Sequence, residues 1–122
     1  MGLFDFLKSK SKALTPNKLD LGWMQTDMHS HLIPGIDDGS KSLEESLEMI
    51  SRLKDFGVKK IVTTPHIMSE YYRNTPEIIH MGLEDLRKAA SAHGLTIQID
   101  AAAEYYMDEI FLERVKSGEK LL

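Results

Sequence analysis

The sequence predicts an α/β fold in which parallel strands are joined by helical crossovers. Three features of the 122-residue chain predict it. Strand-like and helix-like patterns alternate from residue 19 onward, each helical pattern ends at a glycine, and the first two strand-to-strand units have similar lengths of about 35–38 residues. Such alternation is typical of βαβ units with right-handed crossovers. A chain of this length has room for one domain, which we place at residues 19–122.

The first half of this domain contains one strand, one helix and a second strand. Residues 22–31 have the pattern of a short strand. Ser42 and Glu45 then form a capping box at the start of an apolar helical stripe, which ends at Gly57. The β-branched run 58–64 predicts the second strand.

The second half repeats this order. Thr75 supplies a helix N-cap and Pro76 occupies the first helical position. The apolar stripe that follows continues to Gly94. Residues 95–100 predict a third strand, and residues 108–116 predict a third helix. We therefore expect three parallel strands separated by helices.

Composition excludes several classes of protein and of site. There are no cysteines, which excludes disulfide scaffolds, cysteine-ligated metals and thiolate nucleophiles. The net charge of −4 gives no basic field for nucleic acid. No apolar run approaches the roughly 20 residues of a membrane span. We expect a cytoplasmic protein that does not bind nucleic acid.

Residues 1–18 read as an amphipathic lead-in to the domain. The apolar residues Leu3, Phe4 and Leu7 precede four lysines. This order differs from that of a secretory signal, in which the basic residues come first. The pattern predicts either a helix that contacts a membrane surface or a partner, or a helix that packs on the domain.

Side chains that bind metals follow each predicted strand. His29 and His31 come at the end of the first strand, with Asp38 in the turn after it. His66 follows the second strand and Glu104 follows the third. Because the carboxyl ends of parallel strands lie at one edge of a sheet, we expect these groups to converge.

Each of these residues also has a simpler interpretation when taken alone. His29 and His31 would face one side as positions i and i+2 of a strand, and Asp27 shares that side and could orient a ligand. They are also consistent with polar residues at a strand end, and Asp38 precedes Gly39 as in many turns. His66 could be a hydrogen-bonded loop residue, and Glu104 an exposed loop acid.

Taken together, the donor set favours a metal site. Three imidazoles and two carboxylates suit Mn, Fe, Zn or Co, and Glu104 has two oxygens with which to bridge more than one ion. Arg73 lies near these residues in the sequence, either as a phosphate anchor or as a solvated surface residue. The sequence contains no Gly-x-Ser-x-Gly elbow, phosphate loop or dinucleotide fingerprint. Any phosphatase chemistry here would use water activated by a metal ion.

The segments DMHSHLIPGIDDGS, TTPH and AAEYY resemble the polymerase-and-histidinol-phosphatase (PHP) superfamily. The resemblance covers about residues 24–112 and is greatest to a bacterial branch of manganese-dependent tyrosine-protein phosphatases encoded with capsule and exopolysaccharide genes. It implies the N-terminal part of a distorted (β/α) TIM-like barrel with two or three Mn²⁺ ions. The residues that match the metal ligands of the family are His29, His31, Asp38, His66 and Glu104.

The resemblance also implies a reaction and a partner. The family hydrolyses phosphotyrosine, typically on a tyrosine kinase of polysaccharide export. Its members are longer, and their later motifs supply further ligands, so the chain resembles an N-terminal half only. Histidinol phosphatase or another phosphoesterase is one alternative. An inactive remnant that acts as a binding module is another, and an unpaired outer strand could lead to oligomers.

Overall fold

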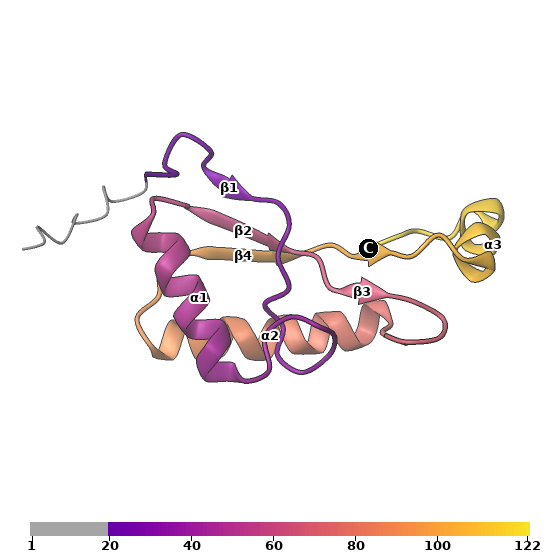
Figure 1. Cartoon of the computed structure of the whole chain (residues 1–122), viewed down its shortest axis with the longest axis horizontal. Helices are drawn as coiled ribbons and strands as arrows, with labels where there is room; N and C mark the ends of the chain where they lie inside the picture. Colours follow the sequence, from indigo (N-terminus) through magenta and orange to yellow (C-terminus); the bar gives the residue numbers. More distant parts are fainter. Residues whose placement is uncertain (1–19) are drawn as a thin grey trace, which may run out of the picture.

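The computed structural model describes residues 20–122, and the predicted lead-in at residues 1–18 lies outside them (Figure 1). The strands and helices follow one another from the N-terminal side to the C-terminal side. They are β1 (Thr26–Asp27), α1 (Leu43–Asp55), β2 (Lys60–Thr63), β3 (His66–Ile67), α2 (Pro76–Ala92), β4 (Gln98–Ala101), β5 (Glu104–Tyr105) and α3 (Glu109–Ser117).

The main sheet has three parallel strands in the order β1-β2-β4. Thr26 pairs with Lys60, and β2 pairs with β4 from Lys60↔Gln98 to Thr63↔Ala101. Helices α1 and α2 connect these strands and lie together on one side of the sheet (Figure 1). The predicted α/β fold with parallel strands is confirmed. The described residues form an open sheet.

A second, separate parallel pair, β3-β5, forms beyond the predicted ends of the second and third strands. The sequence predicted that the second and third strands stop at residues 64 and 100. Pairing instead resumes after Pro65, with Glu104 N donating to Pro65 O at 2.9 Å and Tyr106 N donating to Ile67 O at 3.0 Å. Proline removes one backbone donor but leaves its carbonyl available, so it interrupts the pairing without ending it.

The first strand is shorter than predicted. Residues 22–24 form a turn, Gln25 has a φ of 61°, and only Thr26–Asp27 pair with β2. The chain then leaves the sheet before His29. The prediction of a strand over residues 22–31 is therefore wrong, because a left-handed residue at its start and the departure at its end leave only two residues in register.

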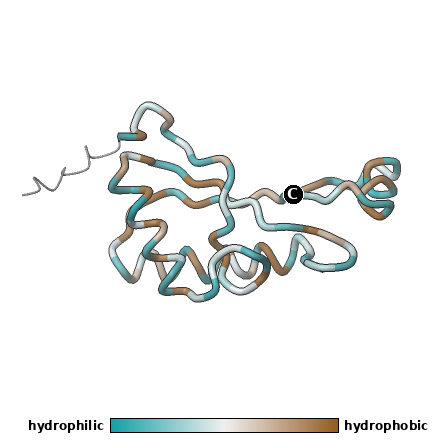
Figure 2. The backbone as a smooth tube through the Cα atoms, in the orientation of Figure 1, coloured by the Kyte–Doolittle hydropathy of each residue, from teal (hydrophilic) through white to brown (hydrophobic). Residues whose placement is uncertain are grey.

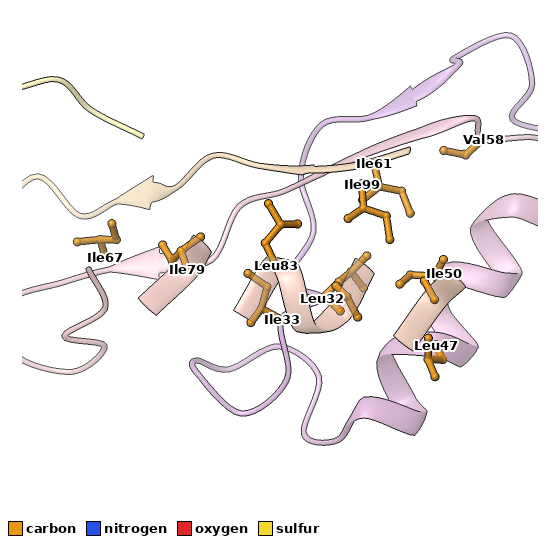
Figure 3. Close-up of a cluster of buried hydrophobic side chains, with 12 residues drawn as sticks. Leu32, Ile33, Leu47, Ile50, Val58, Ile61, Ile67, Ile79, Leu83 and Ile99 are labelled. Atoms are coloured by element: carbon orange, nitrogen blue, oxygen red, sulfur yellow. The ribbon is translucent and has the colours of Figure 1, made fainter. Parts of the chain in front are cut away.

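The hydrophobic core lies between the main sheet and the two long helices (Figure 3). Figure 2 shows apolar segments alternating with polar ones along both helices, as the periodicity predicted. The loop after β1 also contributes, since Leu32 is fully buried and Ile33 nearly so. Burial of this loop fixes the chain next to His31. The other core residues are Leu47, Ile50, Val58, Ile61, Ile67, Ile79, Leu83, Leu86, Ala90 and Ile99.

The helix ends follow the predicted capping signals. Ser42 and Thr75 accept hydrogen bonds from the backbone N–H groups of Glu45 and Ile78, at 3.2 and 3.3 Å. Gly118 ends α3 with a φ of 74°. Among residues 20–122, none of the helices combines the length and the hydrophobicity required to cross a membrane.

Candidate metal centre

Four side chains from three segments of the chain meet at one carboxylate oxygen. This oxygen is Oε2 of Glu104, the first residue of β5. It lies 3.1 Å from Nε2 of His31 and 3.4 Å from Nε2 of His29. Nδ1 of His66, at the start of β3, is 3.8 Å away. The convergence at one sheet edge that the sequence predicted is thus present.

Asp38 forms a second group with two of these histidines. Its Oδ1 lies 3.3 Å from Nε2 of His66 and 3.3 Å from Nδ1 of His31. The rings of His31 and His66 meet edge to face, with centroids 4.7 Å apart. His31 therefore belongs to two triads whose ligand atoms lie within 4.8 Å of one another, the triads being His29, His31, Glu104 and His31, Asp38, His66.

The spacing and the chemistry of these groups fit divalent cations. Ligands held at about 2.0–2.2 Å in tetrahedral or octahedral geometry lie about 2.8–3.6 Å from one another. Most of the nitrogen-to-oxygen distances in the cluster fall in that range. Imidazole and carboxylate are suitable ligands for Mn, Fe or Zn. The residues that converge could therefore hold such an ion with small movements.

The cluster has a buried side and an open side. The side chains of His31 and His66 are 14% and 19% exposed, whereas that of His29 is 68% exposed. Partial desolvation acts to raise the pKa of Asp38, but the nearby imidazoles of His66 and His31 and a backbone hydrogen bond outweigh it, so the pKa lies below its ordinary value. The carboxylate of Asp38 is thus favoured in its charged form, in which it can bind a cation.

Buried polar side chains hold the three segments together. Thr63 accepts a hydrogen bond from Leu32 N at 2.9 Å and donates to Ser30 O at 2.8 Å, so it holds the backbone on both sides of His31. Asn74 donates to Ile36 O and His66 O, at 3.0 and 2.8 Å. The positions of His31 and His66 are therefore set by tertiary hydrogen bonds.

The histidines reach the site by a route that differs from the prediction. His29 and His31 lie after β1, so the alternation of a strand does not orient them. Their ring centroids are nevertheless 5.5 Å apart. Thr64 Oγ1 lies 3.4 Å from His29 Nδ1, and the backbone of Ser30 accepts a hydrogen bond from Thr64 N.

Asp27 lies beside the cluster. One of its oxygens accepts a long hydrogen bond of 3.4 Å from His29 N. The other, Oδ2, is buried and has no hydrogen-bond partner among the described residues. An unpaired buried carboxylate oxygen is costly, so a cation or an ordered water next to it would supply the missing partner. The position of Asp27 is consistent with a residue that orients a metal ligand without binding the ion itself.

Arg73 lies at a different place. It lines a cleft of about 210 Å³ together with Ile67, Tyr105 and Arg114. Alternation along β3 and β5 puts Ile67 and Tyr105 on the face opposite to that of the metal-ligand candidates. Within residues 20–122, no ion pair or hydrogen bond joins Arg73 to the cluster. Its role as a phosphate anchor remains a prediction.

Two residues of the site were not among the predicted metal ligands. Asp37 is buried and accepts hydrogen bonds from the backbone N–H groups of Gly39 and His66. Tyr72 stacks on His66 with centroids 5.4 Å apart and planes 11° apart. Neither has a local pattern that reveals it. In the pair Asp37–Asp38 the sequence gives no indication of which side chain points inward.

Comparisons with known proteins agree with the motifs. Residues 25–122 match a family model described as capsular polysaccharide synthesis, CpsB/CapC. The chain is 33% identical over 90 residues to the tyrosine-protein phosphatase CpsB of Streptococcus agalactiae, covering 74% of this chain and 37% of that protein. It is 32% identical over 62 residues to the tyrosine-protein phosphatase YwqE of Bacillus subtilis, covering 51% of this chain and 24% of that protein.

A solved structure shares the fold. It belongs to a set described as YwqE from Bacillus subtilis and CpsB from Streptococcus pneumoniae, unique metal-dependent tyrosine phosphatases. The TM-score is 0.69 at 23% identity, over 75% of this chain and 37% of that one. The matched part of the chain spans between about a quarter and little more than a third of the length of these relatives. Since the family model covers most of its length, the chain belongs to the CpsB/CapC capsular tyrosine phosphatase family, of PHP type.

Proposed function

We propose that this chain carries the first part of the metal centre of a protein-tyrosine phosphatase that uses metal-activated water. The observation that carries the proposal is the meeting of three imidazoles from two segments at one oxygen of Glu104, at 3.1–3.8 Å. The proposed ligands are His29, His31, Asp38, His66 and Glu104, with Asp27 outside them and Mn²⁺ as the cation, alternatively Fe, Zn or Co.

Within this proposal, the buried and the exposed ligand candidates have different roles. His31 and His66 are largely buried and would hold the inner side of the centre, whereas His29 and Glu104 lie toward solvent, where a phosphoester would approach. Bound divalent cations would supply a water of lowered pKa and neutralise charge on the phosphoryl oxygens. The chain contains no cysteine, so none of its own residues supplies a thiolate nucleophile.

We propose further that the fold is the first part of a distorted (β/α) barrel. The parallel order β1-β2-β4, with ligand candidates at the carboxyl ends of the strands, supports this. The edge of β4 away from β2 would then receive the next strand. Further ligands would come from elements that follow in the barrel.

For the substrate we propose phosphotyrosine on a protein, specifically a bacterial tyrosine kinase of polysaccharide biosynthesis. This rests on the names of the relatives and on the shared motifs rather than on a substrate pocket in residues 20–122. Histidinol phosphate and other phosphoesters are the alternatives that the assay must separate.

Metal binding is tested by titrating Mn²⁺ into the chain and measuring heat. We expect His31→Ala and Glu104→Ala each to weaken binding by at least about tenfold, because each removes a proposed ligand. His80→Ala is the matched control, since His80 is an exposed residue of α2 outside the cluster. Absence of Mn²⁺ binding, or equal losses in the control, would contradict the proposed centre.

Activity is tested by turnover of a phosphotyrosine peptide, p-nitrophenyl phosphate and histidinol phosphate at equal Mn²⁺. The measurement uses this chain alone and this chain joined to the remaining part of Streptococcus agalactiae CpsB. We expect the joined protein to prefer the phosphotyrosine peptide and to lose turnover with chelator or with His31→Ala. Mn²⁺ binding without turnover in either form would favour the non-catalytic alternative.

A further inference from the structure

Asp37 is the most enclosed carboxylate of the cluster. Its side chain has no exposed surface. Oδ2 lies 3.0 Å from Nδ1 of His31 and accepts a hydrogen bond of 3.0 Å from His66 N, while Oδ1 accepts one of 2.9 Å from Gly39 N. A buried carboxylate is stable only when such donors surround it. Asp37 thus joins two of the three segments that form the site.

The segment that carries Asp37 also hydrogen-bonds to and packs against the backbone of His31. Ser40 N donates to His31 O at 3.1 Å. A Cβ added at Gly39 would lie 2.3 Å from that oxygen and 2.4 Å from Cβ of His31, so only glycine allows this approach. The ring and the backbone of His31 are therefore both positioned by residues 37–40.

We propose that Asp37 is a positioning residue that keeps the imidazole proton of His31 on Nδ1, and so presents the lone pair of Nε2 to the candidate cation. A lone pair on Nδ1 would face the oxygens of Asp37 and Asp38, at 3.0 and 3.3 Å, which is repulsive. Nε2 faces one carboxylate oxygen, that of the 41% exposed Glu104 at 3.1 Å, whereas Nδ1 faces two, one of them fully enclosed, so the proton is favoured on Nδ1. A cation between Nε2 and Glu104 would remove the remaining repulsion. Histidines that bind metals commonly donate their other N–H to a carboxylate in this way.

The two neighbouring aspartates then have separate tasks. The side chain of Asp38 is 59% exposed and reaches His66 Nε2 as closely as it reaches His31 Nδ1. Asp37 is closer to His31 and fully enclosed, so it is the acceptor of the His31 proton. Asp38 remains available as a ligand beside Nε2 of His66, while the protonated Nδ1 of His31 does not bind an ion. This inference rests on the proposed metal centre for its purpose, but the position of the proton can be measured without any metal.

The test measures imidazole ¹⁵N chemical shifts of the labelled, chelator-treated chain at a pH at which those shifts show His31 to be neutral. We expect His31 to carry its proton on Nδ1 in the unmodified chain. Asp37→Ala should move the proton toward Nε2, whereas Asp37→Asn should retain it on Nδ1, because the amide oxygen still accepts. Asp85→Ala, an exposed aspartate of α2, is the matched control and should change nothing.

Asp38→Ala provides a second variant that alters only an exposed side chain. If Asp37 holds the proton, Asp38→Ala leaves it on Nδ1. A shift to Nε2 in that variant, or retention on Nδ1 in Asp37→Ala, would overturn the proposal. If Asp37→Ala does not fold, Asp38→Ala still tests whether Asp38, rather than Asp37, holds the proton on Nδ1.

Mn²⁺ affinity gives an independent measurement. We expect Asp37→Ala to weaken binding about 10- to 100-fold, with Asp37→Asn between it and the unmodified chain. Unchanged affinity in a folded Asp37→Ala protein would contradict the positioning role. If the unmodified chain binds no Mn²⁺, the proposed function fails, and the ¹⁵N shifts still decide whether Asp37 sets the proton.

Discussion

Helices α1 and α2 are integrated into the core, whereas α3 is not. The body of the molecule consists of the main sheet with α1 and α2, and the arm consists of β3, β5 and α3 (Figure 1). In the body, α2 buries Ile79, Leu83, Leu86 and Ala90. Helix α3 has no buried residue.

All three helices nevertheless carry similar terminal signals. Each begins with a side chain that accepts a backbone N–H bond, from Ser42, Thr75 or Asp108. Capping defines where a helix begins, but its stability in a protein comes mainly from packing of its apolar face. The difference between body and arm thus shows that helix formation was predictable locally while helix anchoring was not.

The largest expected effect is a difference in the loss of unfolding free energy when the same substitution, leucine to alanine, is made in each region. Leu86→Ala removes a fully buried side chain of α2 and should lower the free energy of unfolding by about 2–5 kcal/mol. Leu112→Ala makes the same change in α3, where the side chain is 49% exposed, and should cost less than about 0.5 kcal/mol. Urea denaturation measures both, and equal losses would show that α3 is anchored as firmly as α2.

The sequence predicted the helices well because the signals that define them are local. Ser42 with Glu45 and Thr75 with Pro76 mark helix starts that the structure confirms within a residue. The β-branched run around Ile61 likewise predicted a strand, and the structure has β2 there. Convergence of His29, His66 and Glu104 was predictable for a different reason, since parallel strands all end at one edge.

Features that depend on tertiary contacts were not predictable. The pairs His66↔Glu104 and Ile67↔Tyr105 form a separate parallel ladder. No alternation of apolar and polar residues in the sequence predicts it. The inward turn of Asp37 is likewise set by His31 Nδ1 and by the backbone N–H of His66, which are distant in sequence.

The second prediction uses the metal to strengthen the connection between the two regions. His66 and Glu104 begin the strands of the arm, while His31 and Asp38 follow β1 of the body. An ion held by both sets would tie arm to body. Mn²⁺ at about 100 times its dissociation constant should raise the free energy of unfolding by about 2.7 kcal/mol.

Chelator should reverse this stabilisation, and Glu104→Gln should largely abolish it while preserving the shape of the side chain. Hydrogen exchange should show the gain at β3 and β5 more than in α1. A gain spread evenly over the chain would indicate that Mn²⁺ does not bridge the two regions.

A third prediction compares the loss of a cap in each region. Thr75→Ala removes the acceptor for Ile78 N and should cost about 1 kcal/mol in the urea transition, because α2 is part of the core. Asp108→Ala removes the acceptor for Phe111 N and for Ser69 N. Since α3 contributes little to the core, its amides should lose protection while the urea transition of the body stays nearly unchanged. Loss of the global transition in Asp108→Ala would mean that the arm is part of the cooperative unit.

The smallest expected effect is an acid transition confined to the arm. Hydrogen bonds from the N–H groups of Phe111 and Ser69 hold the pKa of Asp108 below its ordinary value of 3.8. A lowered pKa in the folded state means that the charged cap stabilises α3 above that value, and that the stabilisation is lost as the pH falls through the lowered pKa. The caps of α1 and α2 are hydroxyl groups, which do not titrate in this range.

The acid transition can be followed by Cα chemical shifts of α3 as the pH falls from about 5 to about 2.5. Glu44 and Glu77, in the first turns of α1 and α2, also have a lowered pKa, so these helices provide the internal reference for acid effects that do not involve an N-cap. Asp108→Asn is the matched control, because asparagine caps a helix without titrating. In that variant, the helicity of α3 should no longer fall more steeply with acid than that of α1 and α2. If α3 in Asp108→Asn still unwinds with the same acid midpoint, the titrating group lies elsewhere, and the arm is held by something other than its cap.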